Sequence, residues 1–351
     1  MTIRPLMDRV GGPHRMMRTG DHDRGVVLIA LLWILTILSV IALSFARETF
    51  VEVAAARNDR DLADAYYIAR AGIATSVYQL YQKMYLTPPP QGLQNLQAQQ
   101  PDAVDLGKVT GQFGDGEYEV EIQDESGKIN LNIVMEEQLR ALINVIGISD
   151  PDASVIVDSI LDWRDSGTMP RPNGAKDDYY QTLQPPYQTW KDAPRMKAVE
   201  ELLLVRGVTP QYFYGRREKT PDGQIVDRYG LLRCLTVYAP ATLRININSA
   251  PLPVLLSIPG MPPAAAQMIY ERRQVKPFTS WDEISKEVVP NPGPAIISYI
   301  SWTRTGIFTL TASAHRTNSK ARRVIRAIIR LNPGGQEKYT ILYWNENIPN
   351  W

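Results

Sequence analysis

The chain has 351 residues, of which 44% are hydrophobic and 21% are charged. These proportions exclude a collagen-like, a wholly disordered and a coiled-coil protein, and the length predicts about two domains. Lys and Arg number 38 and Asp and Glu number 37, so the net charge of +1 favours neither nucleic acid nor a strongly acidic partner.

Cysteine and histidine are too scarce for most metal or catalytic chemistry. The single cysteine, Cys234, excludes an intrachain disulfide, a cysteine-rich zinc site and an iron–sulfur cluster. The three histidines are His14, His22 and His315, and the first two precede the long apolar segment. The sequence also lacks the motifs of P-loop, zinc-protease and serine-hydrolase sites. The composition therefore favours a protein that is not an enzyme.

The first long apolar segment is Val26–Ala46, 21 residues without an ionisable side chain. As a helix rising 1.5 Å per residue it would extend about 31 Å, which matches the hydrocarbon thickness of a bilayer. The 25 residues before it contain five Arg and three Asp. Because an excess of arginine keeps a short flank in the cytoplasm, we predict a transmembrane helix at 26–46 with the following residues outside.

Three interpretations of this segment are open. A signal peptidase could cut after Ala46, although the apolar run is longer than the roughly 7–15 residues of a signal peptide. The segment could remain as an uncleaved anchor. The pair Arg24-Gly25 at its start favours a third: a cytoplasmic protease cuts after Gly25, and the helix that begins at Val26 is retained.

The helical pattern continues beyond the apolar segment. No proline lies between Pro13 and Pro88, and residues 47–85 are rich in alanine. A stripe of apolar residues at spacings of three and four follows, formed by Leu62, Ala65, Ala69, Ile73, Val77 and Leu80. We predict one helix from 26 to 86 that ends at Pro88-Pro89-Pro90, followed by a loop at Gln91–Gln100.

Alternating residues predict strands on both sides of a helical block. Glu117–Gln123 alternates apolar and acidic residues, and Phe308–Ala314 and Val324–Leu331 form a predicted hairpin around a turn at Thr317–Lys320. We therefore predict an α+β fold in which a large, mainly helical domain, 132–300, is inserted into an antiparallel sheet domain made of 87–131 and 301–351.

Basic residues cluster in one place, on the last predicted strand. The cluster consists of Lys320, Arg322, Arg323, Arg326 and Arg330. Arg326 and Arg330 share the strand face opposite the apolar residues, so a solvated sheet face is expected.

Two segments of the helical block share one pattern. Ile129–Asn132 precedes a predicted helix, a turn at Gly147 and a second helix, and Ile245–Asn248 precedes the same order around Gly260. Such units resemble the helix-hairpin-helix, in which amides of the turn bind DNA phosphates. The prolines beside Gly260 remove two amides and Asp150 adds an acid beside Gly147, so a packing motif is favoured.

The stretch Asp158–Tyr180 concentrates aspartates. Asp158, Asp162 and Asp165 would lie on one side of a helix, and Asp177 and Asp178 follow after a turn at 173–174. Clustered carboxylates and amide oxygens are ligands that calcium prefers, although the spacing is not that of an EF-hand. One alternative is that these acids form helix caps and Asx turns, with Asp177 or Asp178 paired to Arg164 or Arg171. The other is a hydrolase that uses Asp162 and Asp177.

Six short motifs, read together, point to one known family. They are Arg24-Gly25, Ala69–Ile73 (ARAGI), Asp124–Asn132 (DESGKINLN), Leu161–Asp165 (LDWRD), Asn173–Tyr180 (NGAKDDYY) and Ile245–Pro251 (ININSAP). With these motifs the chain resembles general secretion pathway protein K, the large minor pseudopilin of bacterial type II secretion systems.

The resemblance implies a pilin-like fold with an inserted helical domain, and a leader at residues 1–25. A prepilin peptidase is expected to cut after Gly25 and to methylate the new terminus at Val26. The inserted domain is expected to bind calcium. The ligands that the resemblance implies are Asp162, Asp165, Asn173, Asp177 and Asp178, and Lys176 among them departs from a pure oxygen set.

The resemblance further implies assembly with the minor pseudopilins I and J at the tip of the pseudopilus. Most pilin-type subunits have a Glu at the fifth mature position, where this chain has Ala30 and no acid before Glu48. A subunit without a neighbour above it would gain nothing from that charge, which is costly in an apolar bundle. We therefore expect a tip-capping, non-catalytic subunit that promotes pseudopilus assembly, anchored by a single span in the inner membrane with its globular part in the periplasm. An exported helix-hairpin-helix DNA-binding protein and a membrane-anchored carboxylate hydrolase are the alternatives.

Overall fold

The structure is a computed structural model that describes residues 22–86, 107–189, 195–219, 222–289, 293–346 and 348. The predicted helix stop at Pro88–Pro90, the predicted loop Gln91–Gln100 and most of the predicted leader lie outside these residues. The chain divides into two units, residues 1–60 and 61–351, and each is described by itself.

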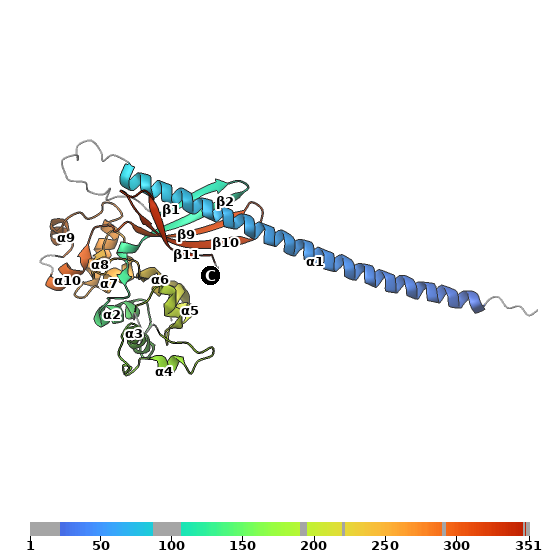
Figure 1. Cartoon of the computed structure of the whole chain (residues 1–351), viewed down its shortest axis with the longest axis horizontal. Helices are drawn as coiled ribbons and strands as arrows, with labels where there is room; N and C mark the ends of the chain where they lie inside the picture. The colour runs from blue at the N-terminus through green and yellow to red at the C-terminus, as the bar shows by residue number, and fades with distance from the viewer. Residues whose placement is uncertain are drawn as a thin grey trace, which may run out of the picture. The chain divides into compact units, whose positions relative to one another are not determined.

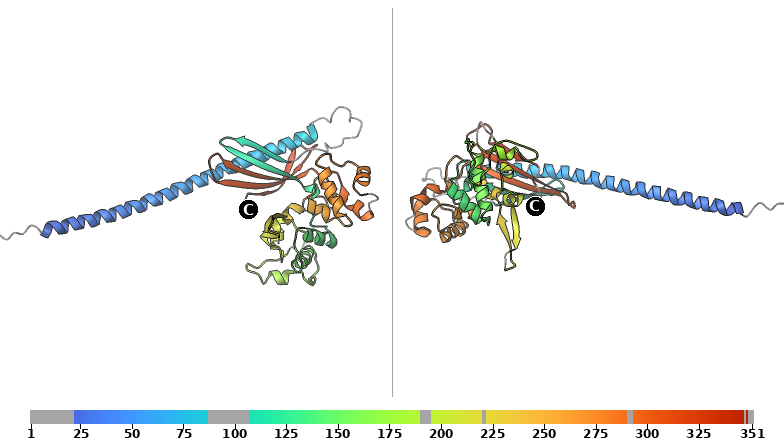
Figure 2. Two further views of the ribbon diagram at one scale, coloured as in Figure 1. Left: turned by 180° about the vertical axis from the view of Figure 1, so that it is seen from behind. Right: turned by 90° about the horizontal axis from the view of Figure 1, so that it is seen from below.

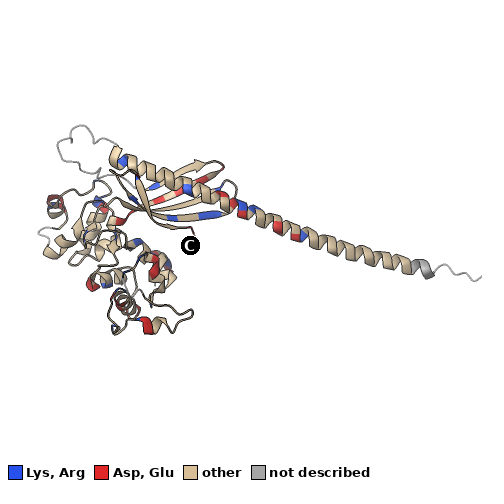
Figure 3. Cartoon of the chain, viewed as in Figure 1, with Lys and Arg blue, Asp and Glu red and all other residues tan. Residues whose placement is uncertain are grey.

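A single helix dominates the first unit. Helix α1 (His22–Tyr81) contains the predicted apolar segment, and every side chain described from Val26 to Arg60 is exposed. Charged residues are absent from its Val26–Ala46 part, and Figure 3 accordingly shows a stretch of the ribbon there without blue or red. By length and composition this helix can cross a membrane. An apolar surface of this extent without protein contacts is suited to a lipid environment.

The second unit contains an antiparallel sheet covered by the rest of α1. The sheet has the order β1 (Lys108–Phe113), β2 (Gly116–Asp124), β9 (Ile307–Arg316), β10 (Arg322–Leu331) and β11 (Tyr339–Asn345). Residues 61–81 of α1 and the π-helical turn Gln82–Leu86 lie along one face of it (Figures 1 and 2).

The contact between α1 and the sheet is a small apolar core. From the helix come Ile68, Ala69, Ile73, Val77, Leu80 and Met84, and from the strands come alternate residues such as Val120, Leu310, Ala312, Ala327 and Ile329. The register places Val120 opposite Ala312 and Ala327 opposite Leu310, so the alternating apolar residues share one face. The predicted helix stripe and the strands at 117–123, 308–314 and 324–331 are confirmed, except that Leu62 is only partly buried.

The helical domain is inserted between the end of β2 and the start of β9. Its first part contains η2 (Glu125–Gly127), β3 (Ile129–Asn130), α2 (Glu136–Val145), α3 (Asp152–Trp163), α4 (Asp177–Tyr180), η3 (Val199–Leu204), α5 (Pro210–Tyr214), β4 (Gly215–Lys219), β5 (Ile225–Tyr229), α6 (Leu231–Cys234) and β6 (Leu235–Thr236). Its second part contains β7 (Ile245–Asn246), α7 (Leu252–Leu256), α8 (Pro263–Arg272), α9 (Trp281–Glu287), α10 (Pro294–Tyr299) and β8 (Ile300–Ser301).

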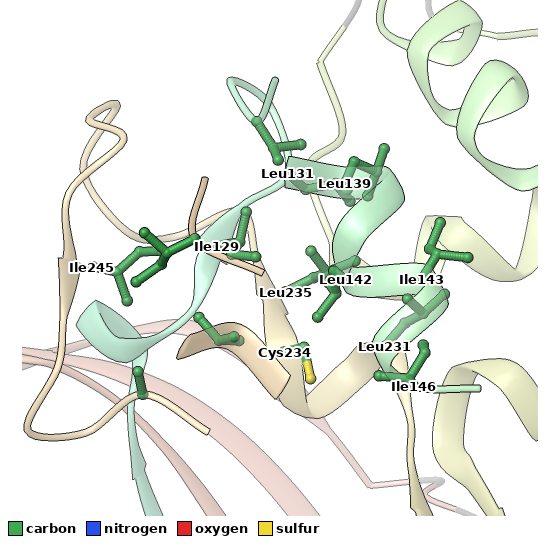
Figure 4. Close-up of a cluster of buried hydrophobic side chains, with 14 of the residues drawn as sticks. Ile129, Leu131, Leu139, Leu142, Ile143, Ile146, Leu231, Cys234, Leu235 and Ile245 are labelled. Atoms are coloured by element: carbon green, nitrogen blue, oxygen red, sulfur yellow. The ribbon is translucent and has the colours of Figure 1, made fainter. Parts of the chain in front are cut away.

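A second, larger core lies inside this insertion. It extends from Ile129 to Ile300 in sequence and includes Leu131, Leu142, Cys234 and Ile245, all of them at most 3% exposed. Figure 4 shows these side chains converging from α2, α6 and the short strands. The α+β fold class with an inserted helical domain is confirmed, whereas the exact domain bounds given above stay a prediction.

The two parts of the insertion repeat one local architecture. Strand β3 pairs in parallel with β6, and β7 pairs in parallel with β8. In the first part Asn132 bonds both backbone groups of Met196, at 3.0 and 2.9 Å, and in the second part Asn248 bonds both backbone groups of Phe278, each at 2.8 Å. The repeated Asn-x-Asn pattern seen in the sequence therefore has a structural purpose: its second Asn fixes a distant loop.

The arginine that follows each helix pair is also placed equivalently. Arg164 donates to the carbonyl oxygens of Leu131 and Val134, and Arg273 donates to those of Ile247 and Ala250. Each guanidinium thus binds carbonyls just after its own Asn-x-Asn strand, which ties the end of the second helix to the start of the unit.

The sequence patterns did not reveal strands β1, β4, β5 and β11. Strands β1 and β11 lie at the sheet edges, where few side chains are buried and alternation is weak. Strands β4 and β5 pair only with each other, and their residues are mostly charged. The pair Asp222-Gly223, with Gly223 at φ +87°, is the turn signal that could have predicted this hairpin.

We expect the closeness of α1 to the sheet to depend on Gly72. A Cβ atom at this position would lie 2.7 Å from the Tyr118 ring, so Gly72→Leu should lower the free energy of unfolding by about 1–3 kcal/mol through overpacking. Thermal unfolding of the full chain in detergent, followed by near-UV circular dichroism, measures this loss.

The control for this variant is Ala74→Leu, which adds the same side chain to an exposed position of the same helix. Its stability should equal that of the wild type. Equal stability of Gly72→Leu and Ala74→Leu would contradict the described packing.

Candidate functional site

The predicted processing site lies at the beginning of α1. Gly25 is in the helix, and Val26 is 67% exposed. The side chains of residues 22–25 lie outside the described part, so the predicted cleavage after Gly25 stays a prediction.

Contacts within the second unit define the end of the sheet at which the insertion begins. Arg316, at the end of β9, pairs with Asp61 at 3.3 Å, which marks the sheet end next to the early part of this helix segment. At the opposite end a Cβ on Gly306 would lie 3.4 Å from the Tyr85 hydroxyl. Because β2 ends and β9 begins at this second end, the insertion leaves the sheet where α1 finishes (Figure 1).

A buried ion pair lies at the point where the insertion begins. The Lys128 amino group is paired with Glu125, and the two side chains are 1% and 0% exposed. The Thr309 hydroxyl of β9 donates to the same carboxylate oxygen at 2.6 Å. Burial raises the pKa of Glu125, but the charge of Lys128 and hydrogen bonds to Lys128, Thr236 and Thr309 outweigh it and hold this pKa below its ordinary value. Burial lowers the pKa of Lys128.

The buried charged groups at this point are called the junction below. Asp124, the last residue of β2, joins three more segments to it. Its Oδ1 atom accepts hydrogen bonds from the backbone N–H and the hydroxyl of Ser126, at 2.9 and 2.6 Å. Its Oδ2 atom accepts from Asn246 of β7 at 3.3 Å and lies 3.6 Å from Arg304. Burial raises the pKa of Asp124, although the Ser126 bonds and the Arg304 charge oppose this shift.

Arg326 of β10 makes the third contact of the junction and corrects one expectation. Its side chain is 4% exposed and donates to Glu200 of η3 at 2.7 Å, so it does not lie on a solvated face. Alternation predicted correctly which face of β10 contains Arg326 and Arg330, and Arg330 is indeed exposed. It could not show that η3, over a hundred residues earlier in the sequence, covers part of that face.

The aspartate stretch forms a loop tied to the end of α3. Asp158 and Asp162 are 6% and 1% exposed. Asp162 accepts hydrogen bonds from the Arg171 guanidinium at 2.7 Å and from the Arg171 backbone N–H at 2.9 Å. Asp158 accepts two from Asn173, both at 3.1 Å. The loop thus folds back on the helix through its own donors. Arg171 pairs with Asp162, whereas Asp177 or Asp178 was the expected partner of this arginine.

The other predicted calcium ligands point to different partners. Asp165 is exposed and accepts from the Gly167 N–H at 3.2 Å, which lowers its pKa. Asp177 accepts from the backbone and hydroxyl of Thr189, both at 2.8 Å, and Asp178 is exposed. These engagements also leave Asp162 and Asp177 with separate roles, which gives no support to a paired-carboxylate hydrolase.

These residues do not gather as a set of metal ligands. Among the residues that the structure describes, no three His, Cys, Asp or Glu side chains converge as metal ligands would. Lys176 instead extends its amino group between the carbonyl oxygens of Asp162 and Asp165. Calcium binding therefore stays a prediction, and Lys176 competes with it for the same oxygen atoms.

The two glycine turns have the backbone of a helix-hairpin-helix without its free amides. Gly147 and Gly260 have φ angles of +84° and +78°. Asp150 accepts a hydrogen bond from the Ser154 backbone N–H at 3.1 Å at the start of α3. Helix α8 begins at Pro263 and follows Pro262, and neither proline has a backbone N–H. The Gly147 carbonyl oxygen also accepts a hydrogen bond from Arg216 at 2.7 Å. A packing motif remains the interpretation that the contacts favour.

Comparisons with known proteins give one consistent result. A sequence model of the family described as type II secretion system (T2SS), protein K, matches residues 123–214. The type II secretion system protein K of Pseudomonas aeruginosa is 25% identical over 290 residues, which cover 78% of each chain. Proteins of the same name from Aeromonas hydrophila and Pectobacterium carotovorum are 29% and 27% identical over 54% of this chain and 60% and 59% of theirs.

A solved structure is similar in fold. It belongs to the GspK–GspI–GspJ complex of the type 2 secretion system of enterotoxigenic Escherichia coli. The TM-score is 0.57 at 15% sequence identity, and the match covers 84% of this chain and 99% of the other. The order of elements described above, with a helical insertion in a helix-covered sheet, is therefore shared over nearly the whole of that chain.

The ion pair at the junction can be tested by removing one charge and then both. Glu125→Gln leaves the buried Lys128 without a counter-charge and should cost about 3–5 kcal/mol of stability. The double variant Glu125→Gln with Lys128→Met should regain most of this loss, because neither charge of the pair is then buried without its partner. Glu119→Gln, which breaks the exposed pair with Lys108, is the control and should change little.

The same variants predict a pH dependence. Because the folded-state pKa of Glu125 is lowered, its contribution to stability is present above 4.5 and is lost as the pH falls through the folded-state value. The lowered pKa of Lys128 gives a slope of the same sign from its folded-state value up to 10.5, so the loss below pH 4.5 is attributed to Glu125. The melting temperature of the wild type should therefore fall more steeply in acid than that of the double variant. Parallel curves would contradict the assignment.

Proposed function

The chain belongs to the family of type II secretion system protein K, and on this premise we propose that it is a minor pseudopilin that caps the pseudopilus tip and promotes its assembly. In this proposal α1 anchors the protein in the inner membrane as a single span, and the residues after it lie in the periplasm. The protein acts by shape and contact, without catalysis.

The tip position is supported by where the insertion leaves the sheet. The early part of the α1 segment in this unit lies beside Arg316, and Tyr85, in the π-helical turn that follows α1, lies beside Gly306. The insertion begins and ends at the Gly306 side, so it extends beyond the helix end that is farther from the apolar segment along the chain. A bulky domain in that position would obstruct another subunit stacked above it.

The apolar part of α1 supports the same position. In a bundle of pilin-type helices, a buried acid is stabilised by the N-terminal amine of a neighbour. This chain has Ala30 at the fifth position after Gly25, and its next acid is Glu48. An uncompensated carboxylate in an apolar environment costs several kcal/mol, so a subunit without that neighbour is better without the acid.

Partner binding is proposed for the helix face that the sheet leaves uncovered. On this face Tyr67 and Tyr78 are 61% and 60% exposed, while Ile68 and Val77 beside them are buried against the strands. Exposed tyrosines on a rigid helix suit protein contacts, because large aromatic side chains contribute strongly to interfaces. We infer that subunits equivalent to GspI and GspJ, the proteins in complex with the similar structure, pack their helices here.

We expect maturation to remove the leader after Gly25 and leave an N-methylated Val26 as the first residue. N-terminal mass spectrometry of the protein purified from membranes with a functional secretion system measures this directly. Gly25→Leu should remain uncut, whereas Gly12→Leu, a matched change inside the leader, should be processed normally. A mature terminus at Arg47 would contradict both the cleavage site and the retained anchor.

We expect the double variant Tyr67→Glu with Tyr78→Glu to lose the I- and J-type partners. Co-purification from detergent-solubilised membranes should fall at least about tenfold, as for loss of central interface residues. Ile225→Glu on the β4–β5 hairpin, 74% exposed, is the control and should retain the partners. Retention by the tyrosine variant would refute this interface, and many copies of the subunit along isolated filaments would refute the tip position.

A further inference from the structure

The aspartate loop contains an enclosed cation that belongs to the chain itself. The Lys176 amino group lies 2.8 Å from the carbonyl oxygen of Asp162 and 2.7 Å from that of Asp165. It also lies 3.5 Å from the Asp165 carboxylate, and its side chain is only 10% exposed. Three oxygen atoms therefore surround an ammonium group that has three hydrogens to donate.

These oxygen atoms would otherwise attract a cation. Asp162 lies in the last turn of α3, whose carbonyls form the negative end of the helix dipole. Carbonyl and carboxylate oxygens in such a turn are the ligand types that calcium prefers. A calcium ion bound to the same two carbonyls would lie next to the Lys176 ammonium, and the two positive charges would repel each other.

Two further acceptors of the loop are also bound by the chain's own cations. Arg171 neutralises Asp162, and Arg206 donates to the Gly174 carbonyl at 3.0 Å. Gly174 itself has no space for a side chain, because a Cβ there would lie 1.9 Å from an Asp162 carboxylate oxygen. The loop is therefore closed around Asp162 by an arginine, a glycine and a lysine.

We propose that Lys176 occupies the place that the family resemblance assigns to calcium, so that this loop folds around a built-in monovalent cation and needs no divalent metal. A lysine that merely caps a helix C-terminus would remain in solvent. Lys176 instead loses most of its hydration and links the end of α3 to the chain beyond it. The cost of this lost hydration can be offset only by a full set of hydrogen-bond acceptors. The inference does not rest on the proposed tip position.

Thermal unfolding of the full chain in detergent, after dialysis against EDTA or with about 1 mM calcium, tests the proposal. The melting temperature of the wild type should be the same in both, and equilibrium dialysis should detect no bound calcium. Lys176→Ala should melt about 5 °C lower in EDTA, because two carbonyls lose their donor. Calcium should raise the melting temperature of this variant alone, since the vacated oxygen atoms can then bind it.

The control is Lys286→Ala, which removes a lysine that is 77% exposed in the same domain and should behave as the wild type. A lower melting temperature of the wild type in EDTA, or one bound calcium ion, would overturn the proposal. So would a Lys176→Ala variant that equals the wild type in EDTA or does not respond to calcium. If Lys176→Ala does not fold, the two wild-type measurements still decide the question.

Discussion

The placement of the inserted domain depends on the buried charges where β2 leaves the sheet. Glu125, Lys128 and Thr309 form one group there, and Asp124 with Arg304 and Arg326 with Glu200 form two more. Burying charges costs desolvation energy, and apolar residues would hold two domains together at least as well. Hydrogen bonds, however, act only along defined directions, whereas apolar surfaces can slide. The charged junction therefore fixes the orientation of the insertion on the sheet, which a subunit that acts by its shape requires.

The inserted domain contains two repeats, one that begins at β3 and one that begins at β7, and both are built in the same way. Each begins with a short strand in which Asn130 or Asn246 turns the chain by accepting the N–H two residues on. The second Asn of each unit then grips a distant backbone segment, and an arginine binds the carbonyls beside it. Only the first of these two repeats contains the aspartate loop and the β4–β5 hairpin in addition. This difference explains why the repeat is weak in the sequence: only the few residues that make backbone contacts are shared.

The fold was predictable where burial leaves a regular trace. Phe308, Leu310, Ala312 and Ala314 alternate because one face of a central strand is covered, and the stripe on α1 has helical spacing for the same reason. Edge strands β1 and β11 leave no such trace. The burial of Arg326 depends on a segment distant in sequence, which periodicity cannot reveal. In the aspartate loop the sequence identified the acids, but it did not show that Arg171 pairs with Asp162 or that Lys176 turns inward rather than to solvent.

The junction and the loop solve a common problem in different ways. Both contain carboxylates that are almost fully buried. Each of these carboxylates needs a positively charged partner whose presence does not depend on the surrounding solution. At the junction the partners come from across the fold, so that breaking them separates two domains. In the loop the partners Arg171 and Lys176 follow closely after the end of α3 in the sequence. The segment therefore supplies its own positive charges. At the location proposed above, outside the cytoplasm, the domain would meet cation concentrations that it does not control. Cations supplied by its own side chains would make the shape of the domain independent of that variation.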